Sequence, residues 1–153
     1  MPKVVSELVV VFIYRKIKHG FEFLLLKRDK SEVYPGIWSI AGGRINENEK
    51  AYETAIREML EETGLTAKHF YLLDTTNVFY EIENDSINFV PLFLAEANDG
   101  EVKLSDEHSE YKWMKYEEAY DKIFWLQWKT NIKEINKILH NEKLFNTLQE
   151  ITT

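Results

Sequence analysis

Three of the six glutamates between residues 42 and 65 are the first feature of the sequence that suggests chemistry. Glu58, Glu61 and Glu62 follow one another at i, i+3 and i+4, which places them on one face of an α-helix. Like charges at this spacing repel and cost the helix roughly a few tenths of a kcal/mol per pair, unless a cation lies between them. Ligands that are all oxygen suit hard ions, so the pattern predicts a site for Mg²⁺ or Mn²⁺ that is shared with substrate phosphates.

The residues around these acids extend the pattern. Arg57 can pair with Glu49, Glu53 or Glu61 through a two-pronged contact. Gly42-Gly43 supplies backbone without side chains, so its carbonyls could also ligate a metal. The same helix face carries small side chains that would let a cluster of metal and phosphate approach closely: Ala51, Thr54 and Ala55.

A helix is predicted from about Glu47 to Thr63. Asn46, followed three residues later by Glu49, resembles a capping box, and Gly64 suits the left-handed position that ends a helix. The helical wheel predicts a buried side made of Tyr52, Ile56, Met59, Leu60 and Thr63. Acidic helix faces are commonly no more than solvated surface, so the spacing of the glutamates does not by itself establish a function.

The elements that must position these residues follow from hydrophobic patterning. Strands are predicted at residues 8–14, 21–27, 37–41, 71–82, 87–97 and 111–114, and two further helices at residues 116–123 and 128–139. We find no internal repeat, low-complexity tract or linker, so residues 1–153 are predicted to form one domain. Hairpins with interspersed helices indicate an α/β (α+β) fold with a mixed sheet flanked by helices.

Composition excludes several classes of protein. The chain has 153 residues, a net charge of −7 and no cysteine, so disulfides and cysteine-ligated zinc are excluded. The acidic charge, without a segregated basic stripe, argues against a nucleic-acid polymer as partner. The longest apolar run, Leu8–Tyr14, is too short to cross a bilayer and has no signal-peptide cleavage site after it. We therefore expect no membrane partner and a cytoplasmic location, which the absence of cysteine fits.

The segment from Gly43 to Leu65 resembles the Nudix box. That motif has nine fixed positions across 23 residues, and all but one match; they fall at Gly43, Glu49, Arg57, Glu58, Met59, Glu61, Glu62, Gly64 and Leu65. Met59 is the one departure, at a place where Ile, Leu or Val is usual, and it falls on the predicted buried side, where Met packs readily. The resemblance extends over nearly the whole chain and implies the Nudix α/β/α sandwich around a mixed sheet.

The resemblance also implies an activity and a set of roles. A Nudix hydrolase cuts a phosphoanhydride bond in a nucleoside diphosphate derivative with the help of divalent ions, here Mg²⁺ or Mn²⁺. Glu58, Glu61 and Glu62 would carry the metals together with the Gly43 carbonyl, and Arg57 and Glu49 would orient them. Either Glu61 or Glu62 would be the general base. A further acid is expected from the stretch Asp106–Glu110, with Glu107 as first choice and Glu110 as second, although both could simply be solvated.

Residues outside the motif suggest a substrate. Leu104–Trp113, with Lys27, Arg28 and Trp38, is similar to bacterial nucleoside triphosphate pyrophosphohydrolases of the dATP type, which favours a (deoxy)nucleoside triphosphate. Trp38 could stack on a base and the two cations could meet a phosphate; the alternatives are a core tryptophan and solvated strand ends. Tyr80 lies close to where some diadenosine polyphosphate hydrolases have a tyrosine, so a dinucleoside polyphosphate is second and a nucleotide sugar third.

Two questions stay open at the level of the sequence. Some Nudix-like domains only bind nucleotides, but such domains typically lose acids of the box, and all are present here. The sequence therefore favours the hypothesis that the protein is an enzyme acting on a small nucleotide. Family members often form homodimers, and the residues do not decide whether this chain does.

Overall fold

The strands of this chain form one mixed sheet. Within residues 1–152, which the computed structural model describes, the sheet has nine strands: β1 (Lys3–Val5), β2 (Leu8–Ile17), β3 (Gly20–Arg28), β4 (Trp38–Ser39), β5 (Ala41–Arg44), β6 (Ala67–Glu81), β7 (Ser86–Ala97), β8 (His108–Met114) and β9 (Gln149–Glu150). The helices are α1 (Ala51–Thr63), α2 (Tyr116–Lys122), α3 (Leu126–Leu139) and α4 (Glu142–Phe145).

Strand β2 is the centre of the sheet and has different partners along its length. It runs parallel to β7 on one edge, from Val10 to Tyr14. On the other edge it pairs antiparallel with β3 near its end and with β5 near its beginning. The pairing of β2 with β5 places Gly42 opposite Val10 and Gly43 opposite Val9, so both glycines are part of the sheet. This arrangement fixes the glycine pair under the helix that follows it.

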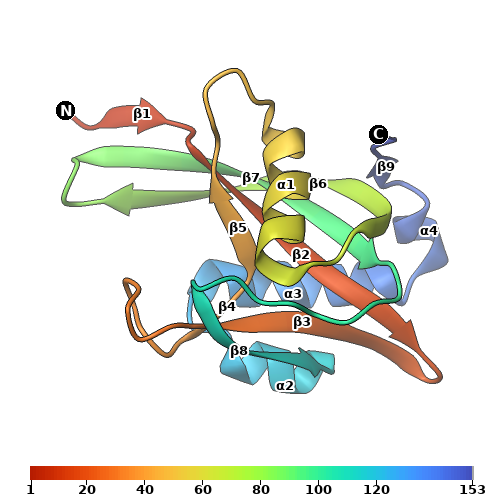
Figure 1. Ribbon diagram of the computed structural model, residues 1–153. Coiled ribbons are helices and arrows are strands. Elements are labelled where there is room, and N and C mark those ends of the chain that lie inside the picture. The colour runs from red at the N-terminus through yellow and green to blue at the C-terminus, as the bar shows by residue number, and fades with distance from the viewer. Residues whose placement is uncertain (153) are drawn as a thin grey trace.

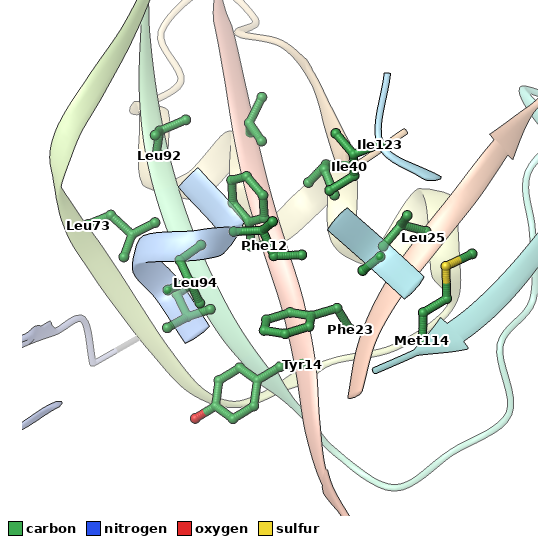
Figure 2. Packing of buried hydrophobic residues seen from close by; sticks show 14 of the residues in the cluster. Phe12, Tyr14, Phe23, Leu25, Ile40, Leu73, Leu92, Leu94, Met114 and Ile123 are labelled. Atoms are coloured by element: carbon green, nitrogen blue, oxygen red, sulfur yellow. The ribbon is translucent and has the colours of Figure 1, made fainter. Parts of the chain in front are cut away.

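Each face of the sheet packs against different helices. Side chains alternate along β2, because successive residues of a strand point to opposite faces. One face packs on α1 through the cluster that includes Val9, Val11, Ile13, Ala55 and Met59, and the other packs on α2 and α3 through the cluster that includes Val10, Phe12, Tyr14, Ala119, Ile132 and Ile135. Figure 1 shows α1 in front of the sheet with α2 and α3 behind it, and Figure 2 shows the packing of the second cluster. The predicted α/β/α sandwich is confirmed.

Helix α1 begins later than the sequence predicts. Asn46 and Glu49 form a turn before the helix, in which the Glu49 carboxylate accepts from the Asn46 N–H at 3.1 Å. The helix starts at Ala51, and the Lys50 N–H donates to the Glu53 carboxylate at 2.9 Å. The prediction that a capping box at Asn46 starts the helix is therefore wrong. The Glu49 side chain instead belongs to the turn before the helix, where it binds Arg57. The end was predicted correctly: Gly64 has φ 72° and donates its N–H to Leu60 O.

The buried side of α1 also differs from the helical wheel. Leu60 is 51% exposed, although the wheel placed it on the buried side. Glu62 is only 4% exposed, although the wheel placed it on the polar side. The residues of α1 that are buried are Thr54, Ala55, Met59, Glu62 and Thr63. The helix is thus rotated so that one edge of its acidic face lies against the sheet.

The other predicted elements are present with shifted ends. The apolar piece at 37–41 is divided between β4 and β5, and the glycine pair belongs to β5. The strand at 111–114 is the second half of β8, and the helices at 116–123 and 128–139 correspond to α2 and α3. Three elements were not predicted from the sequence, because they are short and mostly exposed and so show little periodicity: β1, α4 and β9. No helix within the described chain is long and apolar enough to span a membrane.

Candidate active site

Glu62 is the most deeply buried acid of the motif. It lies on the last turn of α1, and its Oε2 accepts a hydrogen bond from the Gly42 N–H at 2.9 Å. Burial, together with the nearby charges of Glu58 and Glu107, raises the pKa of the Glu62 carboxyl to about 9. Without a cation nearby, this carboxyl is therefore protonated at neutral pH.

Glu58 lies one turn earlier and covers Gly43. A Cβ atom at Gly43 would lie 2.3 Å from the carboxyl carbon of Glu58, so only glycine leaves room for this carboxylate. The side chain of Glu58 is 13% exposed, and burial raises its pKa in spite of the contact with Arg57. The glycine pair thus lets two carboxylates approach the strand backbone closely.

Arg57 connects the acids of α1 to the turn before the helix. Its Nε and Nη2 donate to the two carboxylate oxygens of Glu49 at 2.8 and 2.9 Å, which is the predicted two-pronged contact. Its Nη1 donates to Glu58 at 2.9 Å and to Glu61 at 3.1 Å. A further bond from Nη2 reaches the Arg44 carbonyl at 3.0 Å. One guanidinium therefore holds three carboxylates and the end of β5.

Glu49 is held as a carboxylate by this contact. The hydrogen bonds from Arg57, and then the one from the Thr54 hydroxyl at 2.6 Å, lower the pKa of the Glu49 carboxyl to about 2. Glu61, in contrast, has a side chain that is 56% exposed and is held only by Arg57. The glutamates therefore occupy three different environments: paired for Glu49, buried for Glu58 and Glu62, and solvated for Glu61.

A fifth acid reaches the site from the beginning of β8. Carboxylate oxygens of Glu62 and Glu107 and a ring nitrogen of His108 all lie within 4.8 Å of one another. The Glu107 carbonyl accepts from the Asp29 N–H at 2.9 Å, which fixes the loop to the end of β3. Glu110, the second choice from the sequence, points to Lys27 instead, at 3.2 Å. The structure thus brings Glu107, and not Glu110, to the acids of α1.

His108 is the residue of this cluster that sequence reasoning missed. It is 6% exposed, and its Nδ1 is buried without a hydrogen-bond partner. Burial, and to a lesser extent the charge of Arg28, lowers the pKa of the His108 imidazole to about 4. Its position directly after Glu107, inside the acidic stretch at 106–110, was the signal that could have identified it.

The predicted substrate-binding residues are only partly near these acids. Trp38 lines an open depression in the surface with Leu104, Ser109, Glu110, Tyr111 and Lys112. The Nζ of Lys27 lies 6.0 Å from the centre of the Trp38 ring. Arg28 is engaged with its own loop, because its Nε donates to the Val33 carbonyl at 2.6 Å. The Tyr80 hydroxyl donates to Asp85 at 2.8 Å within the β6–β7 hairpin, and the structure gives it no contact with the acids.

The acids fit a divalent cation. Burial, and then the charge of Glu107 among other acids, raises the pKa values of Glu58 and Glu62, and within residues 1–152 the positive partner of Glu58 is Arg57. Buried carboxylates without a counter-charge are costly, and a bound cation removes that cost. Oxygen ligands from α1 and β8 are of the type that Mg²⁺ and Mn²⁺ prefer.

The chain is similar in sequence to proteins of one known family. The family model for the NUDIX domain matches residues 7–134. The asymmetrical bis(5'-nucleosyl)-tetraphosphatase of Caenorhabditis elegans is 33% identical over 110 residues, which cover 70% of this chain and 77% of the relative. The nucleoside triphosphatase NudI of Escherichia coli K12 is 30% identical over 111 residues, covering 67% of this chain and 79% of the relative.

Solved structures give the same result. The chain superposes on a Caenorhabditis elegans Ap4A hydrolase complex with a TM-score of 0.76 and 26% identity, covering 89% of this chain and 98% of that one. A Nudix hydrolase structure from Listeria monocytogenes gives a TM-score of 0.78 at 26% identity, covering 96% and 100%. Fold, motif and relatives agree, and the chain belongs to the Nudix hydrolase family, whose members act on pyrophosphate bonds.

Proposed function

We propose that this protein hydrolyses a phosphoanhydride bond of a nucleoside polyphosphate with the help of Mg²⁺ or Mn²⁺. The observation that carries the proposal is the meeting of Glu62 from α1 with Glu107 from the residue just before β8, with the charge of Glu58 nearby. Burial disfavours the charged forms of Glu58 and Glu62, and the nearby charge of Glu107 adds to this, so a cation between the three carboxylates would stabilise their anionic forms.

Each residue has a proposed role. Glu58, Glu61, Glu62 and Glu107 hold the cation with the Gly43 carbonyl, while Arg57 and Glu49 position this set. The cation, when bound, supplies charge neutralisation of the polyphosphate and acidifies the attacking water. Glu49 is a positioning residue, because both of its oxygens are occupied by Arg57 and Thr54.

The reaction requires that a water proton be accepted. We assign this role to Glu61 or Glu62: the oxygen of water attacks phosphorus, the bridging P–O bond breaks and the carboxylate takes the proton. Glu61 is solvated and attached by one bond to Arg57, whereas Glu62 Oε2 is occupied by the Gly42 N–H. Replacing each by Gln separates the roles, since loss of a ligand lowers metal affinity and loss of only the base lowers kcat alone.

For the substrate, similarity to the relatives supports a different order from the one that the sequence favoured. Similarity to asymmetrical bis(5'-nucleosyl)-tetraphosphatases, in sequence and in structure, supports a dinucleoside tetraphosphate as the first choice. Similarity to NudI supports a (deoxy)nucleoside triphosphate as the second. In either case the depression beside Trp38 is the proposed place for a nucleobase, and Lys27 beside it is the proposed phosphate contact.

The test is a substrate screen with identified products. The purified protein is incubated with Mg²⁺ at pH 8 to 9 and with diadenosine tetraphosphate, dATP, ATP or a nucleotide sugar, and the products are separated by chromatography. We expect diadenosine tetraphosphate to give one nucleoside triphosphate and one monophosphate. Binding of nucleotide without any product across the panel would instead support a non-catalytic module and overturn the proposal.

A further inference from the structure

His108 is the buried polar side chain that the acids leave unexplained. The residue is 6% exposed, yet its Nδ1 has no hydrogen-bond partner among residues 1–152. A buried polar atom without a hydrogen-bond partner is unfavourable in a folded protein, so this ring nitrogen calls for a partner that is not a protein group.

The backbone turns this ring toward the acids. Along β3 and β8, Lys27 pairs with Glu110 and Arg28 pairs with His108, so one extra residue, Ser109, interrupts the register. Such a bulge redirects the side chains next to it. Ser109 and Glu110 are exposed whereas His108 is buried, with a ring nitrogen within 4.8 Å of the carboxylates of Glu62 and Glu107.

We propose that the His108 imidazole is a nitrogen ligand of the divalent cation that Glu62 and Glu107 hold. This inference rests on the proposed function, because it assumes that the acids bind such an ion. Imidazole nitrogen is a better ligand for Mn²⁺ and later transition metals than for Mg²⁺, which prefers oxygen. The site therefore binds Mn²⁺ more tightly than the acids alone would, and a purely acidic set is the wrong description of it.

The experiment detects the bond directly and does not depend on catalysis. The protein is labelled with histidine that carries ¹⁵N only in its imidazole ring, loaded with Mn²⁺ to one equivalent and examined by pulsed electron paramagnetic resonance. A directly bound imidazole gives a ¹⁵N hyperfine coupling that backbone nitrogens cannot give, because only histidine carries the label. We expect this coupling in the unmodified protein.

Two variants assign the signal. His108→Gln should lose the coupling, and its dissociation constant for Mn²⁺ should rise about tenfold while that for Mg²⁺ changes less than about twofold. His19→Gln is the matched control, since His19 lies exposed in the β2–β3 turn, and it should keep both the coupling and the affinity. Because the unmodified protein is measured first, a His108→Gln protein that fails to fold would not leave the inference untested.

The outcomes separate this inference from the proposed function. Mn²⁺ that binds without a histidine coupling overturns the role of His108 and leaves the acidic site in place. A coupling that survives in His108→Gln also overturns it, because another histidine would then be the ligand. Failure of Mn²⁺ and Mg²⁺ to bind at all would overturn the proposed function itself.

Discussion

Two glutamates are buried to a similar extent on opposite faces of the sheet, and their surroundings differ. Glu96 is 5% exposed and follows Leu92 and Leu94 on the α2–α3 face, where its Oε1 lies 3.8 Å from Lys16 Nζ. Glu62 is 4% exposed on the α1 face, and its charged neighbours are the carboxylates of Glu58 and Glu107. Glu96 therefore lies near a positively charged side chain of the protein, whereas Glu62 lies near two further carboxylates.

The same contrast holds for the two faces as a whole. The α2–α3 face is a continuous cluster of aliphatic and aromatic side chains (Figure 2), with the paired amides of Asn77 and Asn131 at 2.7 Å as its polar contact. The α1 face includes the glycine pair, the carboxylates above it and His108. We infer that the α2–α3 face mainly stabilises the fold. The α1 face is less stabilising, because it carries the charged groups that would hold a ligand.

The largest expected effect is the loss of turnover in Glu62→Gln. The change removes the buried negative charge at the junction of α1 and β8, and hydrolysis with Mg²⁺ should fall by about 10²–10⁴-fold. Glu96→Gln is the matched control, because Glu96 is buried to the same extent as Glu62 and undergoes the same change. The turnover of this variant should stay within about twofold of that of the unmodified protein. Rates are measured at saturating Mg²⁺ on the substrate found by the screen. Equal losses in both variants would remove the distinction between the faces.

The opposite face is tested by Leu25→Ala. Leu25 is fully buried in the α2–α3 cluster, so the truncation should lower the free energy of unfolding by about 2–5 kcal/mol. The folded fraction should still bind Mn²⁺ with unchanged affinity. Urea denaturation and metal titration together check this, and Leu60→Ala, on the exposed side of α1, should change stability by less than about 0.5 kcal/mol. A Leu25→Ala protein that folds well but loses metal would contradict the division of roles.

The metal-free protein should lose stability as the pH rises. The pKa of the Glu62 carboxyl is about 9 in the folded state and near 4.5 in the unfolded chain, so the folded state binds this proton more tightly. The free energy of unfolding therefore decreases between about pH 4.5 and pH 9, and the loss has reached on the order of 3 kcal/mol at pH 7. Metal binding must release the same proton, which makes affinity for Mg²⁺ increase with pH.

Thermal unfolding in chelator across this pH range measures the decrease. Glu62→Gln should be more stable than the unmodified protein at pH 8 and should lose most of the slope, whereas Glu96→Gln should keep it. Calorimetric titration with Mg²⁺ in buffers of different ionisation enthalpy counts the released proton. A slope that persists in Glu62→Gln would show that another group carries the titration.

The sequence predicted the residue types of the site better than their orientation. The motif identified the acids of α1, Arg57 with Glu49, and the sandwich around the sheet, because those depend on spacing along one chain segment. It could not show that Glu62 is buried and Leu60 exposed, since a helical wheel gives relative angles but not how the helix is rotated on the sheet.

The residues that the start of β8 brings to the site could not be predicted from the sequence for a different reason. Glu107 and Glu110 are equivalent as loop acids until the bulge at Ser109 and the bond from Asp29 N–H to Glu107 O fix which one turns inward. Both depend on pairing with β3, some 80 residues away along the chain. His108 was overlooked for the same reason, since its burial is a property of that pairing.

The smallest expected effect comes from the polar pair of the α2–α3 face. Asn77 Nδ2 donates to Asn131 Oδ1 at 2.7 Å, and both side chains are buried. Asn131→Ala leaves the Asn77 amide unpaired, so the free energy of unfolding should fall by about 1–2 kcal/mol. Turnover and Mn²⁺ affinity should not change, because this amide pair lies on the face opposite α1.

The double variant with Asn77→Ala should lose less free energy of unfolding than the sum of the two single variants, since no buried partner is then left unpaired. A loss of turnover in Asn131→Ala without a loss of stability would mean that buried polar groups on both faces serve the site, and the contrast between Glu96 and Glu62 would need another explanation.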